Sequence, residues 1–385
     1  MRLWYTGGMS VRARYTRRAV VASLLAPVGG RAMLRAAHAL SASERSTVLL
    51  HHTVADWVCS GLPESCIVID GALAPALAVG EYISPPLGLE PPQERLVLSW
   101  QAYTPEGSWL EFALRARSAG TDRWTEWLPL GRWGAGILPA SGGQRTVAGA
   151  ILDIDTVIAA GRGRFEEAQY RVLLHRHSMS APLLSGVAVL AFTPAEPPPL
   201  SRAGSPAWGL VLNVPERSQL AEDPAIARDI CSPTSLAMVL AYFGRDLPVR
   251  AVADAVFDHH ARIYGTWPLN TAFASSLGVP MLVDRFERME QLEAEIIAGR
   301  PVVISHRWSR GQLRGAPLPA SAGHLVVVTG FTPEGDVMVN EPYADPAAGE
   351  PVRRVYRRED IHRTWLKQGS GIVYRVAGAV TPPGS

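Results

Sequence analysis

A proline-rich segment, FTPAEPPPLSRAGSPAWG at 192–209, divides the chain into two parts with different hydrophobic patterns. Its five prolines and two glycines do not suit a regular helix or a central strand, so it is predicted to be an extended, partly rigid spacer. The chain has 385 residues, 47% of them hydrophobic and 19% charged, which is enough apolar material for two packed cores. We therefore expect a linker at 196–209 between a domain at 43–195 and a second domain at 210–385.

The part before the linker is predicted to be all β. The segment WLEFALRAR (109–117) alternates apolar and charged residues with period two, as a half-buried strand does. Turn signals separate it from four similar runs: RLVLSWQAY, RWTEWLPLG, TVAGAILDI and YRVLLHRHS. Short strands at this spacing predict a β-sandwich over 43–195. Five tryptophans in this region are interpreted as core and rim residues rather than as a sugar-binding platform: Trp100, Trp109, Trp124, Trp127 and Trp133.

After the linker the pattern changes to helices followed by strands. The segment ICSPTSLAMVLAYFG (230–244) predicts a buried helix with Ser232 as N-cap, Pro233 at the first helical position and Gly244 at the C-terminal end. A second helix is predicted at 287–299, and strands are expected in RPVVISHRW, HLVVVTGF, GDVMVNEP and GIVYRVAG. This order predicts an α+β domain with an antiparallel sheet.

The composition argues against several classes of function. The formal net charge is +2 and comes partly from the arginine-rich first 35 residues, so no basic face remains for nucleic acid. No glycine-rich phosphate loop with its lysine is present. The paired histidines lack the partners and spacing of metal ligands, so neither a metal nor a cofactor is expected: His51 and His52, His175 and His177, His259 and His260.

The first 39 residues resemble an export signal. Arginines at 12, 14, 17 and 18 precede the apolar run AVVASLLA (19–26), and AHA (37–39) fits the small-x-small pattern cut by a signal peptidase. The arginine pair is similar to that of a twin-arginine signal. The alternative is a frayed basic N-terminus with the true start at Met9. No later run reaches the ~18 apolar residues of a membrane span, so we expect no integral span in the mature protein and an extracellular or cell-envelope location.

Export changes the interpretation of the three cysteines. Cys59 and Cys66 close a short loop, and an oxidising compartment would favour a disulfide between them. Cys231 is then left unpaired. It lies at the predicted N-terminus of a helix, where free N–H groups and the helix dipole favour a thiolate and can stabilise an oxyanion. His324, which begins a strand, is available as the base. The spacing alone leaves a catalytic pair and a buried core cysteine as equal alternatives.

A family resemblance favours the catalytic pair. The segments VPERSQL, CSPTSLAMVLAYFG, GTWPLNTAFASSLGV, AGRPVVIS, AGHLVVVTGFTPEGDVMVNEP and SGIVYRV, in this order over 210–378, resemble the bacterial papain-like cysteine peptidases related to bacteriocin leader-processing domains. The resemblance implies a papain-like fold, a Cys-His pair oriented by Asn or Asp, and amide hydrolysis through a thioester. The preceding sandwich is similar to the accessory region of exported members.

The resemblance also assigns roles to particular residues. It implies that Cys231 is the nucleophile and that His324 is the general base that then protonates the leaving amine. Gln219 matches the glutamine that supplies an oxyanion donor, although a loop glutamine is the alternative interpretation. In GTWPLN, Trp267 and Asn270 suit contacts with a peptide, and a buried tryptophan is the alternative there.

The residue that orients His324 depends on the register of a predicted hairpin. The chain has NEP at 340–342 where the family usually has Asn-Asp-Pro. A three-residue loop would pair Thr332 with Asp336, so even-numbered residues would share a face and Asn340 would accept the His324 Nδ1 proton. A four-residue loop, or the alignment of NEP with the family motif, selects Glu341 instead. We favour Asn340.

These inferences predict a secreted cysteine hydrolase that cleaves a peptide or isopeptide bond, with a cell-wall peptide as one candidate substrate. An acyl transferase that passes the thioester to an amine is an alternative. A second alternative is a catalytically silent binding protein whose β domain carries the useful surface. The presence of both Cys231 and His324 favours the hydrolase.

Overall fold

The structure is a computed structural model that describes residues 46–59 and 61–378. The predicted export signal at 1–39 and the alternative start at Met9 lie outside the described residues. Within the described ranges, no helix is both long enough and apolar enough to cross a membrane.

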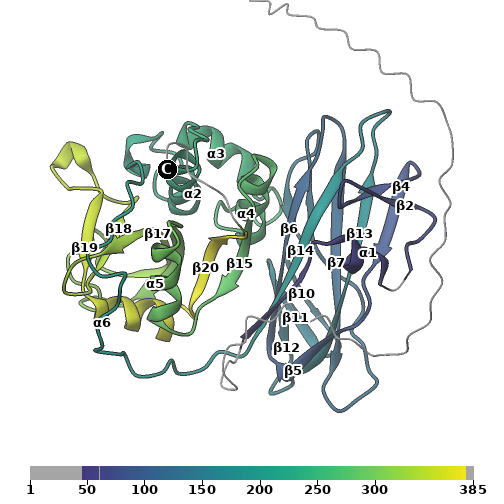
Figure 1. Cartoon of the computed structure of the whole chain (residues 1–385), viewed down its shortest axis with the longest axis horizontal. Coiled ribbons are helices and arrows are strands. Elements are labelled where there is room, and N and C mark those ends of the chain that lie inside the picture. The colour runs from purple at the N-terminus through teal and green to yellow at the C-terminus, as the bar shows by residue number, and fades with distance from the viewer. Residues whose placement is uncertain (1–45, 60, 379–385) are drawn as a thin grey trace, which may run out of the picture. The chain divides into compact units, whose positions relative to one another are not determined.

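The N-terminal part is rich in β-strands (Figure 1). It contains one short helix, α1 (Val54–Val58), and the strands β1 (Ser46–His51), β2 (Cys66–Ile69), β3 (Ala72–Pro75), β4 (Val79–Ile83), β5 (Leu87–Gln93), β6 (Arg95–Tyr103), β7 (Trp109–Ser118), β8 (Leu128–Trp133), β9 (Ala140–Ser141), β10 (Gln144–Val147), β11 (Ala150–Asp153), β12 (Thr156–Ala159), β13 (Phe165–His175) and β14 (Leu183–Phe192).

These strands form two antiparallel sheets among the described residues. One has the order β10-β11-β12-β6-β14-β3-β2, with β1 also paired to β14. The other has the order β4-β13-β7-β8-β9, with β5 also paired to β13. The core between them draws on both sheets: Leu98 and Trp100 of β6 pack in the same cluster as Phe112 and Leu114 of β7. Trp100 stacks on Phe112 with ring centroids 4.1 Å apart.

The strand β6 is buried on both faces, which the alternating pattern did not predict. Leu96, Leu98 and Trp100 point into the core of the N-terminal part. Val97, on the other face, packs against Val283 in a second cluster. Because both faces of β6 are covered, its residues read as a nearly continuous apolar run rather than as an alternation.

The C-terminal part is an antiparallel sheet with helices on both faces (Figure 1). The strand order is β15-β20-β16-β17-β18-β19. The strands are β15 (Met281–Arg285), β16 (Val302–Trp308), β17 (Ser321–Phe331), β18 (Val337–Asn340), β19 (Arg353–Tyr356) and β20 (Ile372–Val376). The helices are α2 (Cys231–Tyr242), α3 (Val249–Val256), α4 (Trp267–Ser276), α5 (Met289–Ile297) and α6 (Arg358–Ile361), with the short turns η1 (Gln219–Ala221), η2 (Pro346–Ala348) and η3 (His362–Lys367). The predicted α+β class is confirmed.

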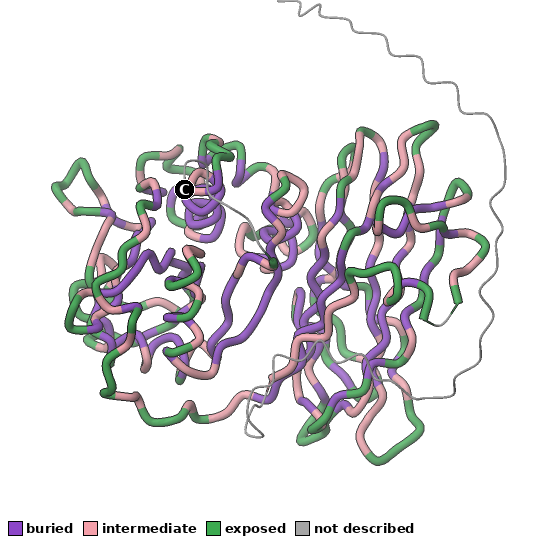
Figure 2. Tube along the Cα trace, in the orientation of Figure 1, coloured by how far each residue is buried: buried purple, intermediate pink, exposed green. Residues whose placement is uncertain are grey.

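Two hydrophobic clusters show which helices cover each face of this sheet. Leu236 of α2 and Val252 of α3 pack with Val327 of β17 on one face. Leu292 of α5 packs with Val326 of β17 on the other. The tube in Figure 2 is buried along most of β15 and β20, in agreement with a sheet that is covered on both sides.

The helix α2 begins earlier than the sequence pattern predicts. Its N-cap is Ile230, which makes no side-chain cap hydrogen bond, and Cys231 is the first helical residue. Ser232, predicted as the N-cap, lies inside the helix, and its hydroxyl donates to Asn270 Oδ1 (2.9 Å). The prediction was wrong because the Ser232 hydroxyl has a tertiary partner on α4 and is not free to cap its own helix.

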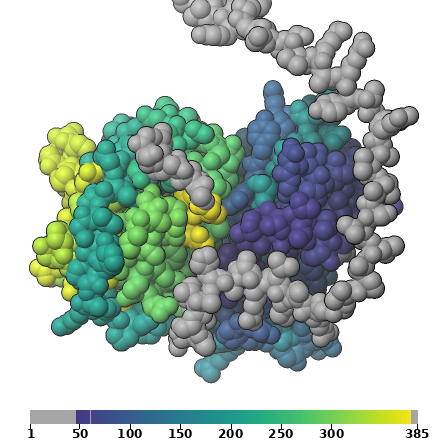
Figure 3. Space-filling model, viewed as in Figure 1, coloured from purple at the N-terminus to yellow at the C-terminus, as the bar shows by residue number. Residues whose placement is uncertain are grey.

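The segment after β14 packs on the C-terminal part rather than standing free. Ala207 is buried, and the Trp208 indole Nε1 donates to Glu293 Oε1 of α5 (3.1 Å). In the space-filling view the teal segment lies against the green and yellow surface of the C-terminal part (Figure 3). These contacts fix the chain where it enters this part.

Candidate active site

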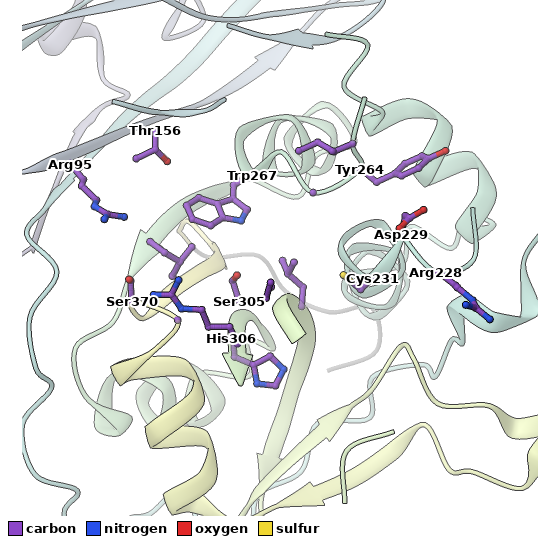
Figure 4. Close-up of a pocket in the computed structure, with 18 of the residues that line it drawn as sticks. Arg95, Thr156, Arg228, Asp229, Cys231, Tyr264, Trp267, Ser305, His306 and Ser370 are labelled. Atoms are coloured by element: carbon purple, nitrogen blue, oxygen red, sulfur yellow. The ribbon is translucent and has the colours of Figure 1, made fainter. Parts of the chain in front are cut away.

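Cys231 is held at the start of α2 and faces a cavity of about 670 Å³. Its side chain is half-buried, and it lines this cavity together with Arg228, Trp267 and His306 (Figure 4). The N–H groups of Cys231 and Ser232 belong to the first helical turn, which has no acceptor within the helix. The helix therefore presents unpaired donors beside the thiol.

His324 lies in β17, directly opposite His306 of β16. It is 2% exposed, and its Nε2 atom is 2.6 Å from Oε1 of Glu341. Because Nε2 faces Glu341, Nδ1 is the ring nitrogen left to interact with Cys231, whose thiol contributes to the raised pKa of His324. The structure thus brings three predicted residues, Cys231, His324 and Glu341, into one continuous chain of contacts.

Glu341 is fully buried and accepts three hydrogen bonds. The His324 ring and the Tyr343 backbone N–H (2.9 Å) share Oε1, while the Tyr356 hydroxyl donates to Oε2 (2.9 Å). A buried carboxylate requires such partners to remain ionised. Glu341 is therefore a buried carboxylate whose two oxygens both accept hydrogen bonds, one of them from His324.

The electrostatics of the pair follow from these contacts. Burial by itself would lower the pKa of His324, but the Glu341 charge and the hydrogen bonds with Cys231 and Glu341 raise it above the ordinary value. Burial would also raise the pKa of Glu341, but the charge and hydrogen bond of His324 lower it. Both groups are thus held in their charged forms, as an imidazolium and a carboxylate.

The preference for Asn340 was wrong, although the predicted loop is present. Thr332 N–H donates to the Asp336 carbonyl (2.9 Å), as a three-residue loop requires. Further along, Gly330 pairs with Met338 but Val328 pairs with Val339, so Thr329 is an extra residue with no register partner on β18. This β-bulge reverses the parity of the hairpin. It places Glu341, not Asn340, on the face that carries His324.

Asn340 has a structural role instead. It is fully buried, and its Nδ2 donates to the carbonyls of Val214 (3.1 Å) and Pro215 (3.3 Å). It therefore fixes the segment that follows the linker against β18 and does not contact His324.

Three other predicted site residues have different outcomes. Trp267 lines the cavity. Asn270 does not: it is fully buried, it accepts from Ser232, and its Nδ2 donates to the Tyr264 and Thr266 carbonyls (both 2.9 Å). Gln219 is buried, and its Nε2 donates to the Ala227 carbonyl (2.7 Å), which supports the turn before Cys231. Its role as an oxyanion donor stays a prediction.

The predicted disulfide is absent. Cys59, Cys66 and Cys231 all carry free thiols. The Cys59 side chain is exposed and donates to the Asp56 carbonyl (3.1 Å), whereas Cys66 is 3% exposed in β2 and packs in the core. One thiol thus lies on the surface and the other points inward.

Two residues near His324 were missed by the sequence reasoning. The His306 ring stacks on that of His324, with centroids 5.8 Å apart, and His306 also lines the cavity. Burial, followed by the charge of His324, lowers the pKa of His306 to about 3, so this ring is neutral at physiological pH. Tyr356 is the other missed residue, because its contact with Glu341 depends on the pairing of β18 with β19. The apolar pattern of each strand contained no signal for either contact.

Both parts of the chain match known protein families. Residues 211–373 match a family described as peptidase C39-like, and residues 33–191 match one described as the peptidase C39 N-terminal domain. A crystal structure described as a C39-like peptidase from Bacillus anthracis is 21% identical to the chain. That match covers 44% of this chain and 98% of the other, with a TM-score of 0.34. No curated protein matches the chain.

Proposed function

Residues 211–373 match the peptidase C39-like family and residues 33–191 match the peptidase C39 N-terminal domain, and from these matches we propose that the chain is a cysteine hydrolase that cleaves a peptide or isopeptide bond through a thioester on Cys231. The observation that carries the proposal is the contact chain from Cys231 through His324 to the buried Glu341. A core cysteine and a core histidine would not require a buried carboxylate behind them.

The proposed first half-reaction forms the thioester. In the resting pair the Cys231 proton already resides on the His324 ring, and the Cys231 thiolate attacks the substrate carbonyl carbon. The resulting oxyanion lies near the first-turn N–H groups of α2, which can donate to it. When the intermediate collapses, the C–N bond breaks and the imidazolium of His324 gives its proton to the leaving amine.

The proposed second half-reaction releases the acid. His324 removes a proton from water, the hydroxyl attacks the thioester carbonyl, and the C–S bond breaks to return Cys231. Throughout the cycle Glu341 holds the imidazole in one orientation and stabilises its charged form. A carboxylate does this more strongly than the amide of an asparagine because it carries a full negative charge.

We propose, in addition, that the protein is exported to the cell envelope or beyond. The support is the arginine-rich segment, the apolar run at 19–26 and the cleavage pattern at 37–39. Fractionation of cells that express the full chain, followed by intact-mass measurement, tests this. Export with loss of the first 39 residues supports it, and full-length protein confined to the cytoplasm contradicts it.

Alkylation with iodoacetamide and peptide mapping tests the proposed chemistry, with Cys59 as an exposed thiol in the same molecule. Cys231 is expected to react at least about tenfold faster than Cys59, and His324→Ala should remove most of that advantage. Peptide turnover should be lost in Cys231→Ala, with folding verified by circular dichroism. Equal reactivity of the two thiols, together with no turnover, would favour the binding protein. Product analysis in the presence of an added amine distinguishes the two reactions. A transferase would form a new amide with the amine, whereas a hydrolase would release the free acid.

A further inference from the structure

The N-terminal part contributes a wall to the cavity that contains Cys231. Arg95, Thr156 and Phe192 line the same cavity as the residues of the C-terminal part. Figure 4 shows Arg95 and Thr156 on the opposite side of the cavity from Cys231. A substrate that fills the cavity would therefore touch both parts of the chain.

The strand register places Arg95 on the face of β6 that borders this cavity. In β6, Arg95 pairs with Phe192 of β14 on one side and with Ile158 of β12 on the other. Cross-strand partners share a face. Phe192 packs against Val283 of the C-terminal part, so Arg95 lies on the face that meets that part. Its position is thus set by three paired strands rather than by a loop.

Buried polar contacts fix this wall against the C-terminal part. Asp155 Oδ2 accepts from the Trp267 backbone N–H at the start of α4 (2.9 Å). Asp258 Oδ1 accepts from the Ser141 backbone N–H (3.1 Å). Both carboxylate side chains are buried. Contacts of this kind are directional, so they hold the wall in one position.

The cavity is rich in positive charge. Four arginines line it against a single aspartate, Asp229: Arg95, Arg228, Arg262 and Arg307. None of the four forms an ion pair within the described ranges of the chain. Arg307 donates to the Gln368 carbonyl and Arg262 lies over the Phe257 ring, so these two contacts do not place a carboxylate against either guanidinium. A concave site lined by one sign of charge attracts the opposite charge.

We propose that this cleft selects peptides that carry carboxylate groups and that Arg95 of the N-terminal part is a specificity-determining residue. The inference rests on the proposed function, because it takes the substrate of Cys231 to be a peptide. An acidic peptide fits because a guanidinium binds a carboxylate through two parallel hydrogen bonds. The N-terminal part is then a component of the substrate site rather than a separate module.

Protection of Cys231 from iodoacetamide tests the selection without requiring turnover. The probes are two amidated hexapeptides that alternate alanine with glutamate or alanine with glutamine. We expect half-protection at a glutamate-peptide concentration at least about threefold lower than that of the glutamine peptide, with a smaller difference at high salt. Equal protection by the two peptides, or protection by neither, would overturn the proposal.

The variants Arg95→Gln and Arg95→Glu should reduce the preference, and the charge reversal should reduce it more. The matched control is Arg123→Glu, an equal charge change at an exposed turn of the same part, outside the cavity. The control should keep the wild-type preference; equal effects of Arg95→Glu and Arg123→Glu would reject the role of Arg95. Selective protection without cleavage of any amide would reject the hydrolase and retain the selection of acidic peptides by the cleft. Cleavage of peptides together with equal protection by the glutamate and glutamine peptides would retain the hydrolase and reject the selection of acidic peptides.

Discussion

The Nε2 atom of His324 lies 2.6 Å from Oε1 of Glu341, and neither side chain is exposed by more than 3%. The contact joins β17 to the residue that directly follows β18, and it depends on one extra residue, Thr329, in β17. An orienting carboxylate in this position is charged, whereas an asparagine would be neutral. The pair therefore has consequences for activity, for the pH dependence of folding and for the residues that surround it.

Glu341→Gln is expected to reduce peptide turnover by about 10²–10⁴-fold, because the neutral amide neither stabilises the imidazolium nor fixes its tautomer. Asn340→Ala should lower the free energy of unfolding by about 1–3 kcal/mol, because the Pro215 carbonyl loses its Asn340 donor and the Val214 carbonyl keeps only the bond from Arg353. Its turnover per folded molecule should stay within a few fold of wild type. Steady-state kinetics and urea unfolding check both. If Asn340→Ala lost turnover and Glu341→Gln kept it, Glu341 would be rejected as the orienting residue.

Tyr356→Phe should reduce kcat by roughly 3- to 30-fold with little change in KM, because the hydroxyl holds Glu341 and does not line the cavity. Burial, then the Glu341 charge, raises the pKa of Tyr356, so its hydroxyl remains a donor at neutral pH. Its loss should raise the pKa of Glu341 and move the acid limb of the rate profile to higher pH. A profile of unchanged shape would indicate a purely structural role.

The stability difference between wild type and Glu341→Gln should depend on pH. The pKa of Glu341 is lowered from its ordinary 4.5, so its contribution is present above pH 4.5 and is lost as the pH falls through the folded value. The pKa of His324 is raised from 6.5, so its contribution is complete below pH 6.5 and is lost as the pH rises through the folded value. The difference should be largest between pH 4.5 and 6.5. Urea unfolding from pH 4 to 10 measures it, and a constant difference would contradict the ion pair.

Asp155 offers a separate test of the contact between the two parts. Asp155→Ala removes the acceptor for Trp267 N–H and should cost about 0.5–2 kcal/mol at neutral pH, whereas Asp155→Asn keeps an acceptor oxygen. Burial raises the pKa of Asp155 from 3.8 to about 6. Its contribution is therefore complete below pH 3.8 and is lost as the pH rises through about 6.

Wild type should consequently lose stability relative to Asp155→Asn between about pH 4 and 6, by on the order of 1–3 kcal/mol. Thermal unfolding at matched pH values checks this. If the wild type instead gained stability relative to the asparagine variant between about pH 4 and 6, burial would not raise the pKa of Asp155.

Local sequence patterns were sufficient to predict several helices and strands. The period-two alternation at 109–117 corresponds to β7, and the apolar spacing after Cys231 corresponds to α2. The order of motifs that resembles the family also predicts the pair of Cys231 and His324. The turn between Thr332 and Asp336 could also be predicted from the sequence, because proline and glycine set its backbone angles.

The identity of the residue that contacts His324 depends on tertiary contacts. The segment that follows the linker crosses β17: Leu212 N–H donates to the Thr329 carbonyl (2.7 Å), and Phe331 N–H donates to the Leu210 carbonyl (2.9 Å). A side chain at Gly330 would collide with the Leu210 carbonyl, 2.2 Å from the position of its Cβ. This remote segment satisfies the backbone groups that the bulge leaves unpaired. The parity of the hairpin, and with it the choice of Glu341, therefore depends on residues more than a hundred positions away in the chain, which no local pattern contains.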